Sequence, residues 1–465
     1  MPTDTHATEI PPGLARQLQE RGLEAVLEPA RRAGPAALGA LVRDLEAVDW
    51  TMLDRQRAAL LEGPPPPPEG LEPPELLPPS LQDTPENRAA AEAGWELLRR
   101  GGAALATVAG GQASRLGFEG PKGAFPLGPV SGATLFQILA GQVRRLRERA
   151  GWKIPWVIQT GPGNHADTEA FFEARSWFGL GRDRVRLVCQ GTLPALSEEG
   201  GFLLAAPDRL FRNPDGHGGF YRALTRSGTL AWLREQGVEH LFYCQVDNPL
   251  VRMGDPVFLG HHLLQRADMS VKVVEKTDPA EKVGLVVRHE GHHLCVEYSD
   301  LSEEFCARRA ADGGLEFRAG NIALHAFRLD FVEAMAGADL PLHLARKQVR
   351  ALDGHLDPVP RPGVKFETFV FDALPRAGKV VVQLADRAEE FSPVKNREGV
   401  DSIRSSREHA DARARRWMEA LGLRPAAAGW TEIEPGLALD LEDLRRRRDE
   451  LELACGGRLL RRRRA

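Results

Sequence analysis

Residues suited to phosphate binding follow the apolar run at residues 105–109. The run stops at Gly110-Gly111, and two cations, Arg115 and Lys122, come soon after it. A loop of small residues with two cations offers backbone amides and positive charge to the oxygens of a triphosphate. The loop contains neither G-x-x-x-x-G-K-[ST] nor G-x-G-x-x-G. An ordinary glycine turn between a strand and a helix is therefore the alternative interpretation of this segment alone.

A carboxylate stands at the end of a second apolar run. Residues 241–246 are nearly all apolar, and Asp247-Asn248 follows them. At the carboxyl end of a buried parallel strand a carboxylate lies on the edge of the sheet where ligands bind. Together with substrate phosphates it would hold Mg²⁺, a hard cation that takes oxygen ligands. The alternative is a turn cap, because Asp-Asn is a good turn-forming pair.

Two further segments carry groups that could meet a phosphate or a sugar. Pro214-Asp-Gly-His-Gly-Gly219 has glycines that permit φ > 0 and let the backbone approach a flat ligand, and His217 could donate to a phosphate or hydroxyl. A tight surface turn is the alternative. Lys395 follows the extended segment Phe391-Ser-Pro-Val394. Lysine suits a phosphate oxygen, although most lysines are simply solvated.

The elements around these segments alternate between strands and helices from residue 84 onward. Such alternation predicts an α/β fold with a mainly parallel, mixed sheet and helices on both faces. We expect strands at residues 103–109, 156–160, 185–189, 241–246, 269–274, 283–288, 294–298 and 380–384, and helices at 84–100, 134–149, 165–177 and 330–335. In this arrangement both apolar runs end at the ligand-binding edge.

Three parts of the chain are expected. Residues 1–93 form a helical N-terminal segment that ends in a proline-rich connector, which cannot be helical. Residues 94–398 form the α/β domain, and 399–465 a small C-terminal domain. The tail from residue 441 is predicted to be a solvated amphipathic helix because its arginines alternate with leucines and acidic residues. Nucleic-acid binding by these arginines is the alternative, without a supporting motif.

Composition narrows the class of protein. The 465 residues are 42% hydrophobic and 27% charged, with a formal net charge of −4, which indicates a soluble protein with no overall attraction to nucleic acids or anionic membranes. No C-x-x-C spacing suggests zinc or a disulfide framework among the five scattered cysteines, which are Cys189, Cys244, Cys295, Cys306 and Cys455. The polar N-terminus lacks a signal pattern, and no run of eighteen apolar residues occurs. We therefore expect a cytoplasmic protein.

Taken together, these segments resemble the UDP-sugar pyrophosphorylase (UDPGP type 1) family, and most of all its UDP-N-acetylglucosamine branch. The resemblance covers about residues 94–397. Its matching segments, in the family's order, are residues 109–117, 121–123, 134–137, 190–194, 214–219, 246–248, 273–276, 283–284, 296–298, 319–321, 369–372 and 392–396. It implies a Rossmann-like nucleotidyltransferase sheet and a cytoplasmic uridylyltransferase that acts as a monomer, without nucleic-acid or membrane partners.

The resemblance also implies a role for each candidate site residue. The UTP-binding positions are Gly110, Gly111, Gln190, Gly216 and His217. The catalytic cations, which neutralise the phosphates, are Arg115, Lys122 and Lys395, and the Mg²⁺ ligand is Asp247. The sugar-binding positions are Gly284, Glu297 and Asn321, with Phe369 and Phe371 as walls of the pocket.

The implied reaction is attack by an oxygen of a sugar 1-phosphate on the α-phosphorus of UTP, with pyrophosphate leaving. It needs positioning and charge neutralisation, and no general base, because the attacking oxygen is already ionised. Arg115 and the segments 246–248 and 392–396 favour N-acetylglucosamine 1-phosphate. His217 instead resembles the UDP-glucose branch, so a glucose-specific or broad enzyme stays open, as does a non-catalytic UDP-sugar-binding regulator. Ala113-Ser114 departs from the family's Gly-Thr, and Ala113 requires φ < 0.

Overall fold

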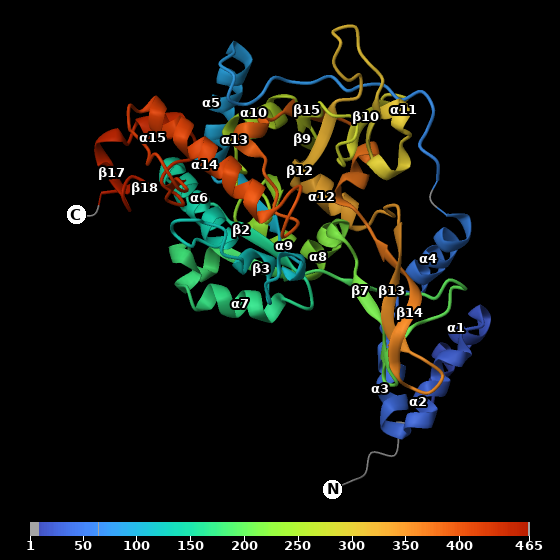
Figure 1. The fold of residues 1–465 in the computed structure, drawn as a ribbon. Coiled ribbons are helices and arrows are strands. Elements are labelled where there is room, and N and C mark those ends of the chain that lie inside the picture. Colours follow the sequence, from blue (N-terminus) through green and yellow to red (C-terminus); the bar gives the residue numbers. More distant parts are fainter. Residues whose placement is uncertain (1–8, 64, 464–465) are drawn as a thin grey trace. The chain divides into compact units, whose positions relative to one another are not determined.

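The computed structural model describes residues 9–63 and 65–463, which divide into two compact units (Figure 1). The smaller unit combines Met1–Pro66, Gly191–Phe220 and Asp339–Val370, and the larger one contains Pro67–Gln190, Tyr221–Ala338 and Phe371–Ala465. Each unit is thus assembled from segments that are distant in sequence. The expected domain boundaries near residues 93 and 398 follow the order of the chain and stay a prediction.

The larger unit contains a nine-stranded mixed sheet among its described residues. The strand order is β11-β10-β12-β8-β1-β2-β3, while β9 pairs with β12 and β15. Only β11 and β12 run against the other strands. The strands are β1 (Ala103–Val108), β2 (Trp156–Thr160), β3 (Val185–Cys189), β8 (His240–Gln245), β9 (Met269–Glu275), β10 (Leu285–His289), β11 (His292–Val296), β12 (Ala319–Arg328) and β15 (Val380–Leu384). The expected mainly parallel sheet is confirmed.

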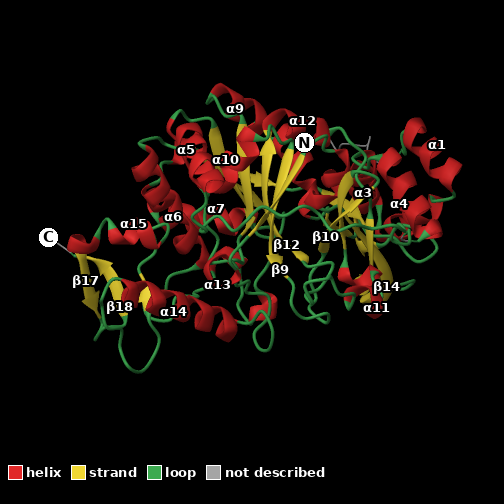
Figure 2. Cartoon of the chain, turned by 90° about the horizontal axis from the view of Figure 1, so that it is seen from above, coloured by secondary structure: helices red, strands yellow, loops and turns green. Residues whose placement is uncertain are grey.

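Helices cover this sheet on both faces, as Figure 2 shows. Successive side chains of a strand point to opposite faces, and on β8 the ring of Phe242 lies 6.3 Å from that of Phe258 of α10. The next residue, Tyr243, lies 6.0 Å from Phe327, which in turn contacts Tyr221 of α8. The helices are α5 (Pro85–Arg99), α6 (Leu135–Ala150), α7 (His165–Glu173), α8 (Phe220–Arg226), α9 (Thr229–Glu235), α10 (Pro256–Leu264), α11 (Glu303–Cys306), α12 (Leu329–Ala336), α13 (Arg387–Glu390), α14 (Ile403–Ala420) and α15 (Leu441–Arg445). Burial on both faces explains why the runs that become β1 and β8 are continuously apolar.

The C-terminal tail corrects one expectation, since residues 441–463 are not one helix. After the short α15, the chain forms β17 (Leu451–Ala454) and β18 (Leu459–Arg462), which pair in a three-stranded sheet with β16 (Glu432–Ile433). Gly456 and Gly457, both at positive φ, make the turn between the two strands. Ion pairs across the strands, such as Arg461 with Glu452, compensate part of the arginine charge. Residues 464 and 465 of the expected tail lie outside the described residues.

The smaller unit packs four N-terminal helices on β-hairpins. These helices are α1 (Pro12–Arg21), α2 (Glu28–Ala33), α3 (Pro35–Glu46) and α4 (Trp50–Glu62), and they share a core with β13 (His343–Leu352) and β14 (Pro358–Glu367). Two short pairs, β4 (Thr192–Pro194) with β7 (Arg212–Pro214) and β5 (Leu204–Ala206) with β6 (Arg209–Leu210), complete it. The expected helical character of the N-terminal segment is therefore confirmed between residues 12 and 62.

Within the described part of the chain, no helix has the length and apolar character needed to cross a membrane. The five cysteines are all unbonded thiols.

Candidate active site

The first two candidate segments leave the sheet side by side. β1 and β8 are parallel neighbours, with Val108 opposite Gln245, and the amide of Val246 donates to the carbonyl of Val108 at 3.0 Å. The glycine loop after β1 and Asp247 after β8 therefore emerge at the same edge. This is the edge at which the sequence places both segments.

Lys122 and Asp247 meet at that edge. The Nζ of Lys122 lies 2.8 Å from Oδ2 of Asp247, and the two side chains are 17% and 12% exposed. The Lys122 amide also donates to the carbonyl of Gly111 at 3.1 Å, so the lysine closes the loop onto its own start. A shielded ion pair of this kind is stronger than one on the open surface. We call Lys122, Asp247 and Lys395, with the loop at residues 109–121, the β1–β8 cluster.

Asn164 holds the glycine loop and was not among the residues selected from the sequence. Its buried side chain donates to the carbonyls of Ala109 and Gly111 at 2.9 and 3.1 Å, and its Oδ1 accepts from the amide of Gly161 at 2.8 Å. One side chain thus fixes the loop to the chain that follows β2. In the sequence it stands in Gly161-Pro-Gly-Asn164, which reads as an ordinary turn.

The side chain of Gln190 lies against Gly110. A Cβ on Gly110 would lie 2.5 Å from the Oε1 of Gln190, whereas a Cβ on Gly111 would meet nothing within 4 Å. The same Oε1 accepts from Nε2 of Gln159 at 3.1 Å, which leaves the amide nitrogen as the donor that Gln190 can offer. Ala113, the irregular residue of the loop, has φ −90° and ψ 21° and is buried. Alanine is therefore compatible with the backbone here.

Lys395 is attached to the same edge by its backbone. The amide of Val394 donates to the carbonyl of Asp247 at 2.9 Å, so the residue before Lys395 lies against the residue after β8. The Nζ of Lys395 is 3.2 Å from Oδ2 of Asp401, and its side chain is 45% exposed. Arg115 is exposed and makes no ion pair with any described residue. The structure thus places the backbone beside Lys395 against Asp247, while the Lys395 ammonium pairs with Asp401 and Arg115 stays on the surface of the loop.

A second group, the β10–β12 cluster, consists of Gly284, Glu297 and Asn321. The amide of Asn321 donates to the carbonyl of Gly284 at 2.8 Å, and a Cβ on Gly284 would lie 3.3 Å from Oε1 of Glu297. Pairing of β10 with both β11 and β12 brings the three residues together. Burial and the nearby Glu297 raise the pKa of Cys295, whose sulfur accepts from the side-chain Nδ2 of Asn321 at 3.4 Å. Phe371 is buried in the same unit.

Gly216, His217 and Phe369 belong to the smaller unit. The His217 ring stacks on Phe369 with centroids 4.9 Å apart, and its Nδ1 accepts from the amide of Val370 at 3.0 Å. Burial and the neighbouring His343 lower the pKa of His217 to about 4, so the ring is neutral at physiological pH and can donate only from Nε2. Gly216 has φ +82°, and a Cβ there would lie 2.4 Å from the carbonyl oxygen of Thr368. A glycine at residue 216 therefore allows the backbone at Thr368 to pack closely against it.

The described acidic groups of the site suit Mg²⁺ only together with oxygens of a bound ligand. In the described ranges no group of three or more His, Cys, Asp or Glu side chains could hold a metal by itself. Asp247 offers one carboxylate on the ligand-binding edge, with Oδ2 on Lys122. Mg²⁺ is commonly bound by one or two carboxylates together with substrate phosphates. The residues therefore suit an ion that arrives with a nucleotide.

Comparison with known proteins decides the family. Residues 88–417 match the sequence model of the UDPGP family, described as UTP–glucose-1-phosphate uridylyltransferase. The chain belongs to the UDPGP family. It is 34% identical over 496 residues to UDP-N-acetylglucosamine diphosphorylase 2 of Arabidopsis thaliana, covering 98% of this chain and 96% of that protein. The resemblance inferred from the sequence motifs is thereby confirmed, and the chain is a uridylyltransferase of this family.

Two further matches extend the comparison. The chain is 37% identical over 432 residues to UDP-N-acetylhexosamine pyrophosphorylase-like protein 1 of Mus musculus, covering 88% of this chain and 85% of that one. It also shares its fold with the crystal structure of the UDP-N-acetylglucosamine pyrophosphorylase of Trypanosoma brucei. That match has a TM-score of 0.80 and 24% identity and covers 97% of both chains. At this identity the structural match shows the fold alone, and it confirms the expected one.

Proposed function

We propose that this UDPGP-family protein forms UDP-N-acetylglucosamine and pyrophosphate from UTP and N-acetylglucosamine 1-phosphate. The observation that carries the proposal is the pairing of Lys122 with Asp247 at the carboxyl edge of β1 and β8. Relatives that match across 88% or more of the chain are named for UDP-N-acetylglucosamine or UDP-N-acetylhexosamine. A phosphate site at this edge and relatives of this kind support the same reaction.

The reaction exchanges one phosphoanhydride bond for another. An oxygen of the sugar phosphate forms a bond to the α-phosphorus of UTP, and the bond from that phosphorus to the β-phosphate oxygen breaks. The leaving pyrophosphate takes the electron pair, and no proton has to be removed from the nucleophile. The protein's task is to hold two polyanions in line and to neutralise charge as it develops. In our proposal Arg115, Lys122 and Lys395 neutralise the phosphates.

Mg²⁺ would be held by Asp247 together with phosphate oxygens of UTP. When bound, the ion supplies positive charge to the triphosphate and favours one arrangement of its oxygens. Gly110, Gly111 and Gln190 would hold the uridine, because Gly111 leaves open space and Gln190 keeps an amide donor. A role for Gly216 and His217 in UTP binding, and for Phe369 and Phe371 in sugar binding, is part of the proposal.

The β10–β12 cluster is proposed to bind the sugar 1-phosphate. Glu297 would accept from sugar hydroxyls, while Asn321 and the backbone at Gly284 supply neutral polar groups. In this proposal the protein acts as a cytoplasmic monomer, without nucleic-acid or membrane partners.

Pyrophosphate release from UTP with four sugar 1-phosphates tests the function. The four are N-acetylglucosamine, N-acetylgalactosamine, glucose and galactose 1-phosphate, each assayed with Mg²⁺. We expect the highest kcat/KM with N-acetylglucosamine 1-phosphate. Faster release with glucose 1-phosphate would instead favour a UDP-glucose enzyme, the alternative that His217 between two glycines supports.

A non-catalytic UDP-sugar-binding regulator is the alternative from another class. Retention of Arg115, Lys122, Asp247 and Lys395 together argues against it, because a binding protein without turnover has no need to neutralise a leaving pyrophosphate. UTP binding without pyrophosphate release at any Mg²⁺ concentration would establish the regulator and refute the enzyme.

A further inference from the structure

Asn248, the residue after the proposed metal ligand, ties together two segments that are far apart in sequence. Its side chain is buried, and its Nδ2 donates to the carbonyl of Glu390 at 2.7 Å. Its Oδ1 accepts from the amide of Ser392 at 3.1 Å and from that of Leu250 at 3.2 Å. Both ends of the amide are therefore used, and two of the three bonds reach the segment that leads to Lys395.

The backbone continues this attachment toward Lys395. Two residues after Ser392, the amide of Val394 donates to the carbonyl of Asp247 at 2.9 Å. Residues 390–394 thus run against Asp247 and Asn248, and Lys395 is the next residue. The ammonium of Lys395 is half exposed and has one ion-pair partner in the described chain, Asp401. The backbone of Lys395 is thus held from two sides, by the segment that precedes it at Asp247 and by the carbonyl of Asp401, which accepts from the Lys395 amide at 2.7 Å.

Buried charges fix the far end of that segment. Lys272 of β9 forms ion pairs with Glu390 and with Asp255, the latter at 2.5 Å, and all three side chains are at most 1% exposed. Breaking a buried ion pair by removing one partner is costly. Glu390 is therefore a firm anchor, and the carbonyl that Asn248 binds belongs to this same residue.

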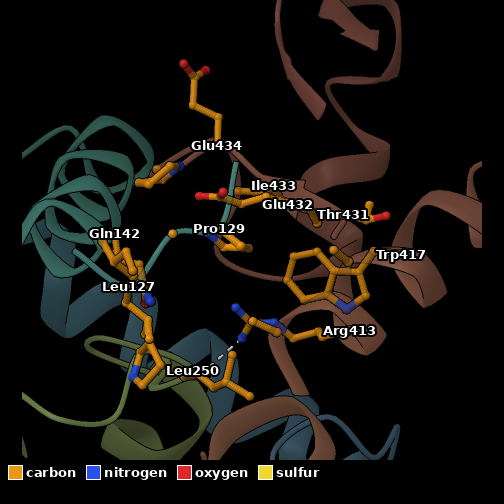
Figure 3. Close-up of a pocket in the computed structure, with 18 of the residues that line it drawn as sticks. Leu127, Pro129, Gln142, Leu250, Arg413, Trp417, Thr431, Glu432, Ile433 and Glu434 are labelled. Carbon is orange, nitrogen blue, oxygen red and sulfur yellow. Dashed lines mark hydrogen bonds between the residues drawn. The ribbon is translucent and has the colours of Figure 1, made fainter. Parts of the chain in front are cut away.

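Helix α14 holds the two segments from the other side. Nη1 of Arg413 donates to the carbonyl of Leu250 at 3.3 Å and to that of Glu389 at 3.0 Å, and the first of these bonds is visible in Figure 3. The guanidinium is partly buried and lines a cavity of about 90 Å³. Ser406 of the same helix donates to the carbonyl of Ser392 at 3.1 Å. The two segments are thus held together from β8, β9 and α14.

We propose that Asn248 is a positioning residue that sets the distance between Lys395 and Asp247. The proposal rests on the proposed function, in which these two residues act on the same triphosphate. An amide is required because the carbonyl of Glu390 needs a donor while the amide of Ser392 needs an acceptor. A carboxylate at residue 248 would keep the second bond and turn the first into a repulsion. The simpler alternative is that Asn248 only caps the turn after β8.

Steady-state kinetics of Asn248→Ala and Asn248→Asp separate these possibilities. We expect kcat/KM for UTP to fall about 10- to 100-fold in both variants, since small misplacements of catalytic groups cost up to that much. The KM for the sugar 1-phosphate should change little. If Asn248→Ala does not fold, Asn248→Asp, which has nearly the same shape, provides the test.

Asn87→Ala is the matched control. Asn87 is equally buried, and its Nδ2 donates to the carbonyls of Pro79 and Gln82 at 2.9 and 2.8 Å, outside both clusters. We expect this variant to lose a similar amount of thermal stability and to keep the kinetic constants of the wild type. Equal kinetic losses in Asn87→Ala and Asn248→Ala would reduce the role of Asn248 to a structural one and overturn the proposal.

A double-mutant cycle with Lys395→Ala provides the decisive readout. If Asn248 acts through Lys395, Asn248→Ala should change the affinity for UTP less than about twofold in the Lys395→Ala background, because coupled residues are not additive. Full additivity would overturn the proposal. Calorimetry measures the affinity for UTP in the wild type, both single variants and the double variant, even if no pyrophosphate is released. A failure of the proposed function is thereby distinguished from a failure of the positioning role.

Discussion

The β1–β8 cluster and the β10–β12 cluster hold their functional groups in different ways. In the first, Lys122 and Lys395 are each paired with a carboxylate, at 2.8 and 3.2 Å. In the second, Glu297 is the single charged group, and Gly284 and Asn321 are joined through the backbone. A cluster of paired charges suits polyanions that exchange partners, whereas a neutral scaffold with one acceptor suits hydroxyl groups. The comparison predicts that the two clusters fail differently when mutated.

The largest effect is expected from Lys122→Ala. Loss of a cation that neutralises developing charge should lower kcat by about 10²- to 10³-fold, as for other electrostatic groups in active sites. Thermal stability should also fall, because the variant leaves the shielded Asp247 carboxylate without its cation. Pyrophosphate release at saturating substrates measures the effect.

Lys153→Ala is the control for that variant, because Lys153 is exposed and outside both clusters. It should retain the kcat of the wild type. A Lys122→Ala variant as active as Lys153→Ala would remove Lys122 from the catalytic group.

A smaller and more selective effect is expected from Glu297→Gln. If Glu297 accepts hydrogen bonds from the sugar, the KM for the sugar 1-phosphate should rise about tenfold, the effect of weakening a charged hydrogen bond. The KM for UTP should stay unchanged. Glu304→Gln, an exposed glutamate in nearby α11, is the control. A rise in the KM for UTP alone would break the distinction between the two clusters.

Sequence and structure agree best where chemistry and burial coincide. β1 and β8 are predicted because continuous apolar runs end in a glycine pair and in Asp247. The hairpin of β13 and β14 was missed because β13 is rich in charged and polar residues and β14 contains Pro358, Pro360 and Pro362. Prolines are confined to strands whose amides are not needed by a neighbour, so no local pattern indicated a strand.

The residues of the candidate site likewise divide into those that the sequence predicts and those that only the structure reveals. Lys122 and Asp247 could be paired from strand ends alone, because parallel strands end at one edge of the sheet. Asn164 and Asn248 could not, since both stand in turn-like sequences and their partners are carbonyls and amides, which any sequence contains. The β10–β12 cluster was predicted only through the family resemblance, because no local sequence pattern shows that β10 pairs with β11 and β12.

A still smaller effect is expected from Asp401→Asn. The pair with Lys395 is 3.2 Å long and half exposed, and such pairs contribute little. Asp401 has φ +52°, a conformation that asparagine tolerates, and its carbonyl keeps the amides of Lys395 and Asn396. The KM for UTP should change less than about threefold. A change above tenfold would show that Asp401 does more than hold the lysine.

The smallest kinetic effect is expected from His217→Asn, which is neutral at pH 7 as the wild type is. Its effect should appear in the pH dependence of stability. The pKa of His217 in the folded state is lowered to about 4 from an ordinary value of 6.5, so protonation favours the unfolded state. The stabilisation by neutral His217 is complete above about pH 6.5 and is lost as the pH falls toward 4. The thermal stability of the wild type should therefore fall more than that of His217→Asn over this pH interval. An identical pH dependence of thermal stability in the two proteins would contradict the lowered pKa of His217.

Pyrophosphate release by Asp247→Asn tests most directly whether the edge of β1 and β8 is the centre of uridylyl transfer. The variant removes the charge that pairs with Lys122 and would hold Mg²⁺, while it keeps the size of the side chain. With UTP, N-acetylglucosamine 1-phosphate and increasing Mg²⁺, we expect kcat to fall by about 10²-fold or more at every concentration, with an unchanged circular dichroism spectrum. Full activity in a folded Asp247→Asn protein would contradict both the metal site and the placement of the reaction at this edge.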